Sequence, residues 1–212
     1  MKMHILYVLA GLILLGCTDE TNSPVLPEYK DTALIAQIIL VENNDGLIGG
    51  IYEQGFNTYH QQTLQVLSDI FGVPVAEMQN MPLNDIIEKY GEEWQINSIK
   101  EAGLAYYDTI ITCRNNYCTE SNFKTILQDL TRNGYIIDLV FCLHGSKTTF
   151  SLYDKSCNVK EFTDYLKSKG ISVRSLYQTC CYGSCVIDEW ENYGIHAVNG
   201  SAGINSITMF SP

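Results

Sequence analysis

Apolar and polar positions alternate along the chain in blocks whose spacing predicts strands and helices in turn. An almost continuous apolar run over residues 32–41 ends at Asn43-Asn44-Asp45-Gly46, which favours a buried strand over a helix. Four more strand-like segments follow, at residues 106–112, 135–143, 171–177 and 195–198. Between the strands, apolar residues recur at helical spacing over 64–71, around 86–90, and over 119–133, 159–170 and 186–194.

This alternation determines the expected fold class. Parallel strands are joined by helical crossovers of ten or more residues, and the helices then cover both faces of the sheet. The sequence therefore predicts one α/β domain, a three-layer αβα sandwich with a mainly parallel central sheet. Thr119 is suited to cap the helix that follows it, and Asn133-Gly134 to end that helix.

Residues 1–16 stand apart from the pattern. Residues 1–4 carry Lys2, and residues 5–15 contain no charged side chain, which is too short to span a bilayer but typical of a secretion signal. No other segment is apolar enough to span a membrane. We assign residues 1–16 to a signal peptide, residues 17–30 to a polar tether, and residues 31–212 to the folded domain.

The apolar run ends in Leu14-Leu15-Gly16-Cys17, which resembles the lipobox of bacterial lipoproteins. That resemblance implies cleavage before Cys17, lipidation of Cys17, and a membrane as a partner. The acidic residues Asp19 and Glu20 resemble the signal that sends lipoproteins to the cell surface in Bacteroidota. The implied location is the bacterial cell envelope, at the outer membrane and exposed on its surface. An ordinary signal peptide with a chance cysteine is the alternative.

The charge balance narrows the possible partners. The formal net charge is −11, and it becomes −12 when residues 1–16, with Lys2 as their only charged side chain, are removed. A surface this acidic repels phosphate, so nucleic acid is not expected as a partner. We interpret Glu92-Glu93 and the other acidic residues as solvated surface.

Seven cysteines follow Cys17, at positions 113, 118, 142, 157, 180, 181 and 185. In an exported protein an odd number leaves at least one thiol free or paired between chains. Cys113 and Cys118 are close enough in sequence to close a small loop, although spacing alone proves no bridge. A Cys-Cys-x-x-x-Cys run lacks the paired spacing usual for zinc, so we expect no metal, and no cofactor.

Two sets of reactive residues follow predicted strands. Leu143-His144-Gly145-Ser146 comes after the strand 135–143, and residues 178–185 (Gln-Thr-Cys-Cys-Tyr-Gly-Ser-Cys) come after the strand 171–177. Strands linked by one crossover bring their carboxyl ends to the same sheet edge. A nearby imidazole and the following helix N-terminus would favour a thiolate, and glycine lets backbone N–H groups approach an oxyanion. The sequence therefore predicts a nucleophilic thiol site.

With these residues, and the helix and strand of residues 188–200 after them, the chain resembles the caspase-like cysteine peptidases over residues 105–203. This clan, called clan CD, includes caspases, legumains, gingipains, clostripain and separase. The resemblance implies a cysteine endopeptidase that forms a thioester acyl-enzyme on peptide or protein substrates. It makes His144 the base or the proton donor to the leaving amine, and assigns the oxyanion hole to the N–H groups of Gly145 and Cys180. Gln178 would line the pocket for the substrate side chain before the scissile bond.

The nucleophile itself has two candidates. The legumain-like register Cys-x-x-Gly places it at Cys180, and the metacaspase-like register places it at Cys181. The strand-end position also favours Cys180. An activated thiolate at Cys180 would be alkylated by an iodoacetamide-type reagent faster than the other thiols.

Departures from the clan pattern keep other functions open. Only 32 residues follow Cys180, so the second half of a caspase is nearly absent, and the pocket is shallow, completed by another chain, or not functional. The oligomeric state and the substrate preference stay undetermined at this stage. The alternatives to a peptidase are a catalytically inactive surface binding protein on the same scaffold, and a legumain-like transpeptidase.

Overall fold

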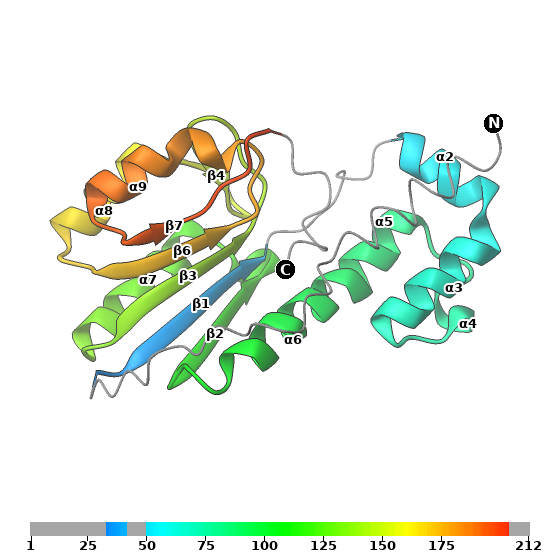
Figure 1. Cartoon of the computed structure of the whole chain (residues 1–212), viewed down its shortest axis with the longest axis horizontal. Coiled ribbons are helices and arrows are strands. Elements are labelled where there is room, and N and C mark those ends of the chain that lie inside the picture. The colour runs from blue at the N-terminus through cyan, green and yellow to red at the C-terminus, as the bar shows by residue number, and fades with distance from the viewer. Residues whose placement is uncertain (1–32, 42–49, 204–212) are drawn as a thin grey trace, which may run out of the picture.

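A five-stranded parallel sheet forms the centre of the molecule (Figure 1). The computed structural model describes residues 33–41 and 50–203. The strands lie in the order β2-β1-β3-β6-β7, with β1 (Ile35–Val41), β2 (Thr109–Arg114), β3 (Ile136–Cys142), β6 (Val173–Gln178) and β7 (Ala197–Val198). Every neighbouring pair in this sheet is parallel, which confirms the predicted α/β class.

Side chains of β1 alternate between two apolar layers. Ala36, Ile38 and Leu40 pack on one face of the sheet, and Ile39 and Val41 pack on the other. The first face is covered by α7 (Glu120–Arg132), α8 (Val159–Ser168) and α9 (Ile187–Tyr193), and the second by α6 (Glu92–Gly103). Burial on both faces explains why the strand has no polar alternation, and it gives the expected three-layer sandwich.

The predicted capping residues at the two ends of α7 are confirmed. The side chain of Thr119 accepts a hydrogen bond from the N–H of Asn122 at 3.3 Å. Gly134, just beyond the helix, has a φ of 77°, which an L side chain rarely adopts. Asn158 caps α8 in the same way, by accepting from the N–H of Glu161.

Between β3 and α8 the chain forms a short antiparallel hairpin, which the sequence pattern did not predict. Its strands are β4 (Thr149–Ser151) and β5 (Ser156–Asn158). Phe150 anchors the hairpin, because its buried ring lies against the rings of Phe141, Phe162 and Trp190. The hairpin is therefore part of the core beside the end of β3.

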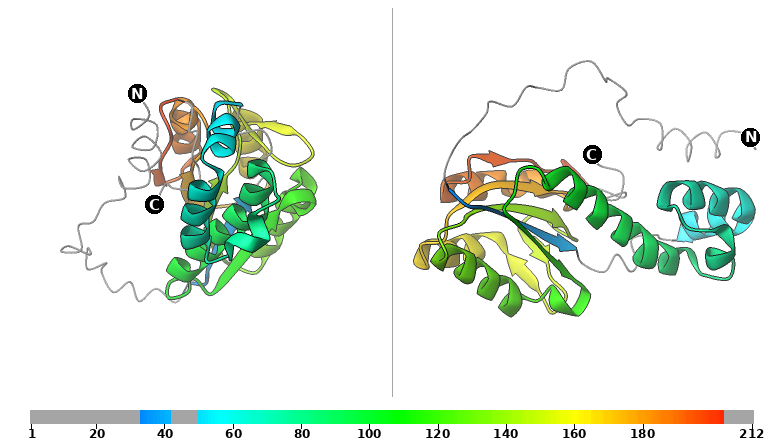
Figure 2. Two further views of the ribbon diagram at one scale, coloured as in Figure 1. Left: turned by 90° about the vertical axis from the view of Figure 1, so that its right-hand side faces the viewer. Right: turned by 90° about the horizontal axis from the view of Figure 1, so that it is seen from below.

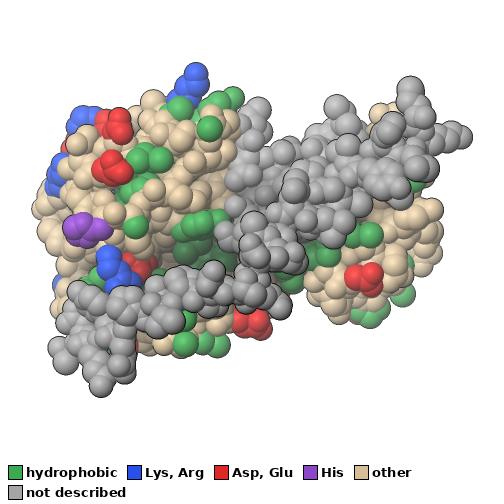
Figure 3. Space-filling view, viewed as in Figure 1, with side chains coloured by type: hydrophobic (Ala, Val, Ile, Leu, Met, Phe, Trp, Pro, Cys, Tyr) green, Lys and Arg blue, Asp and Glu red, His purple; other side chains and the backbone are tan. Residues whose placement is uncertain are grey.

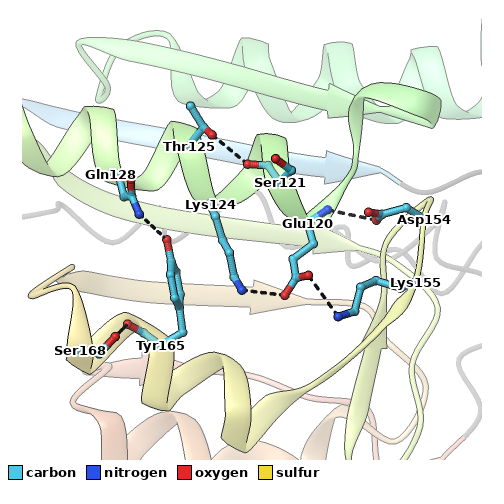
Figure 4. Close-up of polar contacts among 9 residues, drawn as sticks. All are labelled: Glu120, Ser121, Lys124, Thr125, Gln128, Asp154, Lys155, Tyr165 and Ser168. Atoms are coloured by element: carbon cyan, nitrogen blue, oxygen red, sulfur yellow. Dashed lines mark hydrogen bonds and ion pairs between the residues drawn. The ribbon is translucent and has the colours of Figure 1, made fainter.

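Polar contacts tie this hairpin to the start of α7 (Figure 4). The Glu120 carboxylate pairs with Lys124 at 2.7 Å and with Lys155 at 3.1 Å, and the Glu120 N–H donates to Asp154. These two lysines lower the pKa of Glu120. Exposed pairs of this kind contribute little energy each, so their main consequence is to position the hairpin turn.

Residues 50–91 form a helical arm that lies beside the sheet in Figures 1 and 2. It consists of α2 (Gly50–Thr58), α3 (His60–Phe71), α4 (Val75–Met78), α5 (Leu83–Ile86) and the π-helical turn η1 (Ile87–Gly91), which runs on into α6. The arm has an apolar cluster of its own, built from Phe56, Leu64, Leu67, Met78, Leu83, Ile86 and Ile87. Among the helices of the described residues, none is long and apolar enough to cross a membrane.

The interpretation of Glu92 as solvated surface is wrong. Its side chain is 0% exposed, and it pairs with Arg114 at the end of β2 at 2.8 Å. Arg114 also contacts Glu93 at 3.0 Å and donates to the Glu88 carbonyl at 2.5 Å. A carboxylate this deeply buried needs such a partner, because an unpaired buried charge is strongly unfavourable.

Several sequence-based assignments lie outside the described residues. These are the signal peptide at 1–16 and the lipidation site Cys17 with the tether to residue 30.

Candidate functional site

The two segments predicted to carry the site, residues 143–146 and 178–185, lie next to each other at the carboxyl edge of the sheet. β3 and β6 are direct neighbours, so the loops that begin after Cys142 and Gln178 lie side by side. A Cβ built on Gly145 would be 2.8 Å from the Cβ of Cys180 and 3.0 Å from the Cys181 carbonyl oxygen. Only a hydrogen fits at this position, which explains why glycine follows His144.

The β4–β5 hairpin holds the His144–Gly145 segment in place. Gly145 forms an isolated antiparallel bridge with Phe150. The N–H of Ser146 donates to Thr149 and the N–H of Ser151 donates to the His144 carbonyl, both at 2.9 Å. This is the non-hydrogen-bonded type of pair, so the bridge does not use the N–H of Gly145.

His144 is half-buried, and this burial lowers the pKa of its imidazole below the ordinary value of 6.5. The shift disfavours the cation, so the ring is neutral at pH 7 and able to accept a proton. The structure therefore keeps His144 in the protonation state that a general base requires.

Cys180 and Cys181 differ sharply in accessibility. Cys180 is 2% exposed and belongs to the core face covered by α7, α8 and α9. Burial raises the pKa of its thiol to about 12, partly offset by the N–H of Leu143. Cys181 is partly exposed and Cys185 is exposed. In this arrangement Cys180 is a protonated and sheltered thiol, and Cys181 is the more accessible of the two nucleophile candidates.

The expected helix N-terminus does not directly follow the cysteines. A turn comes first, in which Tyr182 has a φ of 56°, and then the 3-10 helix η3 (Gly183–Val186). The α-helix α9 starts only at Ile187. A helix dipole falls off within about one turn, so α9 gives little support to a thiolate at Cys180.

The side chain of Gln178 is buried and contacts the loop that carries Cys180. It is 3% exposed, and its side-chain amide donates to the Gly183 carbonyl at 3.2 Å. Its backbone N–H donates to the Asn199 side chain at 2.6 Å. In this arrangement the side chain shapes the turn that carries Cys180.

Residues 199–203 run across this turn, and we call them the C-terminal strap. The N–H of Tyr182 donates to Gly203 at 2.7 Å, and the N–H of Ser184 donates to Ser201 at 3.0 Å. Gly200 lies so close to Gly183 that a Cβ on it would be 2.4 Å from the Gly183 carbonyl carbon. Apart from the glycines themselves, no feature of the sequence predicted these contacts.

The remaining cysteines add no bridge in this structure. None of the seven described cysteines forms a disulfide, Cys113 and Cys118 included. Within residues 33–41 and 50–203, no group of three or more His, Cys, Asp or Glu side chains could hold a metal ion.

Comparison with known proteins identifies no relative, so this protein is classified by its fold and its candidate site alone. The chain matches no protein-family model, and no curated protein or solved structure is significantly similar to it. The described residues define an α/β protein with a parallel five-stranded sheet, compatible with caspase-like folds. At its carboxyl edge it carries a paired His-Gly and Cys-Cys site.

Iodoacetamide will alkylate Cys185 before Cys180 in the resting protein. A pKa of about 12 leaves roughly one thiol in ten thousand ionised at pH 8, and burial further blocks the reagent. We expect Cys180 to react at least about 100-fold more slowly than Cys185, as measured by peptide mass spectrometry over time. This is the reverse of the order that an activated thiolate at Cys180 would give. Equal rates would show that the thiol of Cys180 is more accessible than its burial indicates.

Proposed function

We propose that this chain is a cysteine endopeptidase in which His144 and Cys180 form the catalytic pair. The observation that carries the proposal is the contact between the two loops, in which Gly145 packs directly on Cys180. Two further features support it: burial lowers the pKa of His144 and so favours its neutral imidazole, and the bridge to Phe150 does not use the N–H of Gly145. The finer assignment to the caspase-like clan, and the lipid-anchored location at the cell envelope, are part of the same proposal.

The proposed reaction uses only groups of the chain, the peptide and water. The proton of the Cys180 thiol passes to His144 as the sulfur attacks the peptide carbonyl carbon, and the N–H groups of Gly145 and Cys180 stabilise the oxyanion. The C–N bond then breaks, and the imidazolium gives its proton to the leaving amine. Water hydrolyses the thioester, which releases the acid and restores the thiol.

The burial of Cys180 makes the described arrangement a resting state. Attack requires the turn at Cys181–Tyr182 to move, because the thiol is 2% exposed. Lys147 spans the two loops here, with its ammonium 5.9 Å from the centre of the Tyr182 ring. Substrate binding between the loops would separate this pair and open a path to Cys180.

The experiment is covalent labelling by peptidyl acyloxymethyl ketones with varied side chains next to the reactive carbonyl. The chain from Thr18 to Pro212 is suitable, because its core lies within residues 36–195. We expect one adduct on Cys180 that is lost in Cys180→Ala and in His144→Ala and kept in the control Cys185→Ala. An adduct that survives Cys180→Ala and is lost in Cys181→Ala would move the nucleophile to Cys181. Products formed with an added amine acceptor would identify a transpeptidase.

A non-catalytic binding protein on the same scaffold is the second candidate. The burial of Cys180 and the raised pKa of its thiol favour it. Absence of any His144-dependent adduct across the whole reagent series, in a protein that unfolds cooperatively, would support this candidate and contradict the peptidase.

A further inference from the structure

A groove with aromatic walls lies between the end of α3 and α6, outside the candidate peptidase site. Its volume is about 320 Å³, and its lining residues are Phe71, Val73, Tyr90, Glu93, Trp94, Asn97, Ser98 and Glu101. The last six of these recur at helical spacing from η1 into α6, so they form one continuous stripe. The sequence pattern predicted a helix here but no chemistry.

The groove combines aromatic faces with carboxylates. The rings of Phe71 and Trp94 are 6.4 Å apart, and Glu93 and Glu101 stand on the same stripe of α6 as Trp94. No lysine or arginine lines it. The ring of Tyr90 already attracts a cation, because the Lys89 ammonium lies 4.8 Å from its centre. Glu93 is partly neutralised by Arg114, which leaves Glu101 as the exposed carboxylate at the far end.

The surrounding charge is strongly negative. Residues 50–103 contain two lysines, no arginine and eight Asp or Glu residues, a net charge of −6 out of −11 for the chain. In Figure 3 the visible Lys and Arg side chains lie on the sheet part of the molecule, and an acidic side chain is visible on the part of the arm that is not covered. A field of this sign attracts cations and repels anions.

We propose that this groove is a binding site for the cationic side chains of a lysine-rich or arginine-rich peptide segment. An ammonium over an indole face is stabilised by the ring quadrupole, and a nearby carboxylate supplies the opposite charge. The aromatic walls also bury the aliphatic stem of such a side chain. The inference does not depend on peptidase activity. If the chain is a peptidase, the groove holds a basic part of the substrate away from the scissile bond.

Tryptophan fluorescence tests the site directly. The chain has two tryptophans: Trp94 lines the groove, and Trp190 is 0% exposed in the sheet core. The probe is a blocked tri-lysine peptide added to the chain from Thr18 to Pro212. We expect a saturable change in emission, and no such change with the same peptide after its side chains have been acetylated. In Trp94→Phe the response should disappear, because only Trp190 remains.

A matched pair of charge variants separates this groove from general attraction by an acidic protein. Glu101→Gln should weaken binding by about 2- to 5-fold, the usual effect of one solvent-accessible ion pair. Glu191→Gln removes a charge that is also exposed, from α9, and should leave the affinity unchanged. Equal losses in both variants, a response to the acetylated peptide, or a response that persists in Trp94→Phe would overturn the proposal. None of these results depends on whether the peptidase site is active.

Discussion

Replacement of Gly200 by alanine will destabilise the fold and displace the turn that carries Cys180. The new Cβ would lie 2.4 Å from the Gly183 carbonyl carbon and 2.4 Å from the Ser184 nitrogen, both of which are backbone atoms. Backbone cannot give way as a flexible side chain can, so the strap must move off the turn. Overpacking of this kind costs about 1–3 kcal/mol, and here it also strains the hydrogen bonds from Tyr182 and Ser184.

Urea denaturation of the wild type and of Gly200→Ala measures the loss of stability. The rate of alkylation of Cys180 measures the displacement of the turn. We expect a lower free energy of unfolding in Gly200→Ala and faster alkylation of Cys180, because a displaced strap uncovers the thiol. Gly203→Ala is the matched control, since no heavy atom lies within 4 Å of a Cβ at that position. Its stability should stay within about 0.5 kcal/mol of the wild type. Similar losses in both variants would mean that the strap does not pack on the turn as described.

The sequence predicted the sheet well because its strands are buried on both faces. An almost continuous apolar run such as residues 35–41, interrupted only by Gln37, has one favourable environment, the interior of a covered parallel sheet, and β1 lies there between β2 and β3. The same logic predicted that the loops carrying His144 and Cys180 lie side by side, since it requires only that two parallel strands be neighbours. Local periodicity and crossover geometry were sufficient for these features.

The accessibility of the site could not be predicted in this way. Cys180 is buried because its side chain points to the same face as Leu143, and the strap then covers the turn. That cover depends on contacts such as Gln178 with Asn199, 21 residues apart, which no local pattern encodes. The burial of Glu92 was missed for the same reason. It stands next to a second glutamate, and the buried ion pair is formed with Arg114, 22 residues away on β2.

Replacement of Arg114 by methionine will cost about 3 kcal/mol of stability. The change keeps the aliphatic stem but leaves the Glu92 carboxylate, which is 0% exposed, without its cation. Removal of one partner of a buried ion pair typically costs 3–5 kcal/mol, and the lower figure is appropriate because the Arg114 side chain is 26% exposed. The contact of Arg114 with the Glu88 carbonyl is lost as well, so the junction between β2 and the helical arm loosens.

Arg132→Met provides the control, because its pair with Asp129 is exposed on both sides and such pairs contribute about 0–1 kcal/mol. The decisive comparison adds Glu92→Met to Arg114→Met. If the cost comes from an unpaired buried charge, the double variant will be more stable than Arg114→Met alone, because an apolar side chain of similar length needs no partner. If the double variant is the less stable of the two, the loss comes from packing at the arm junction and not from the carboxylate. The same urea titration of the four chains distinguishes these cases, and so determines whether electrostatics or packing joins the arm to the sheet.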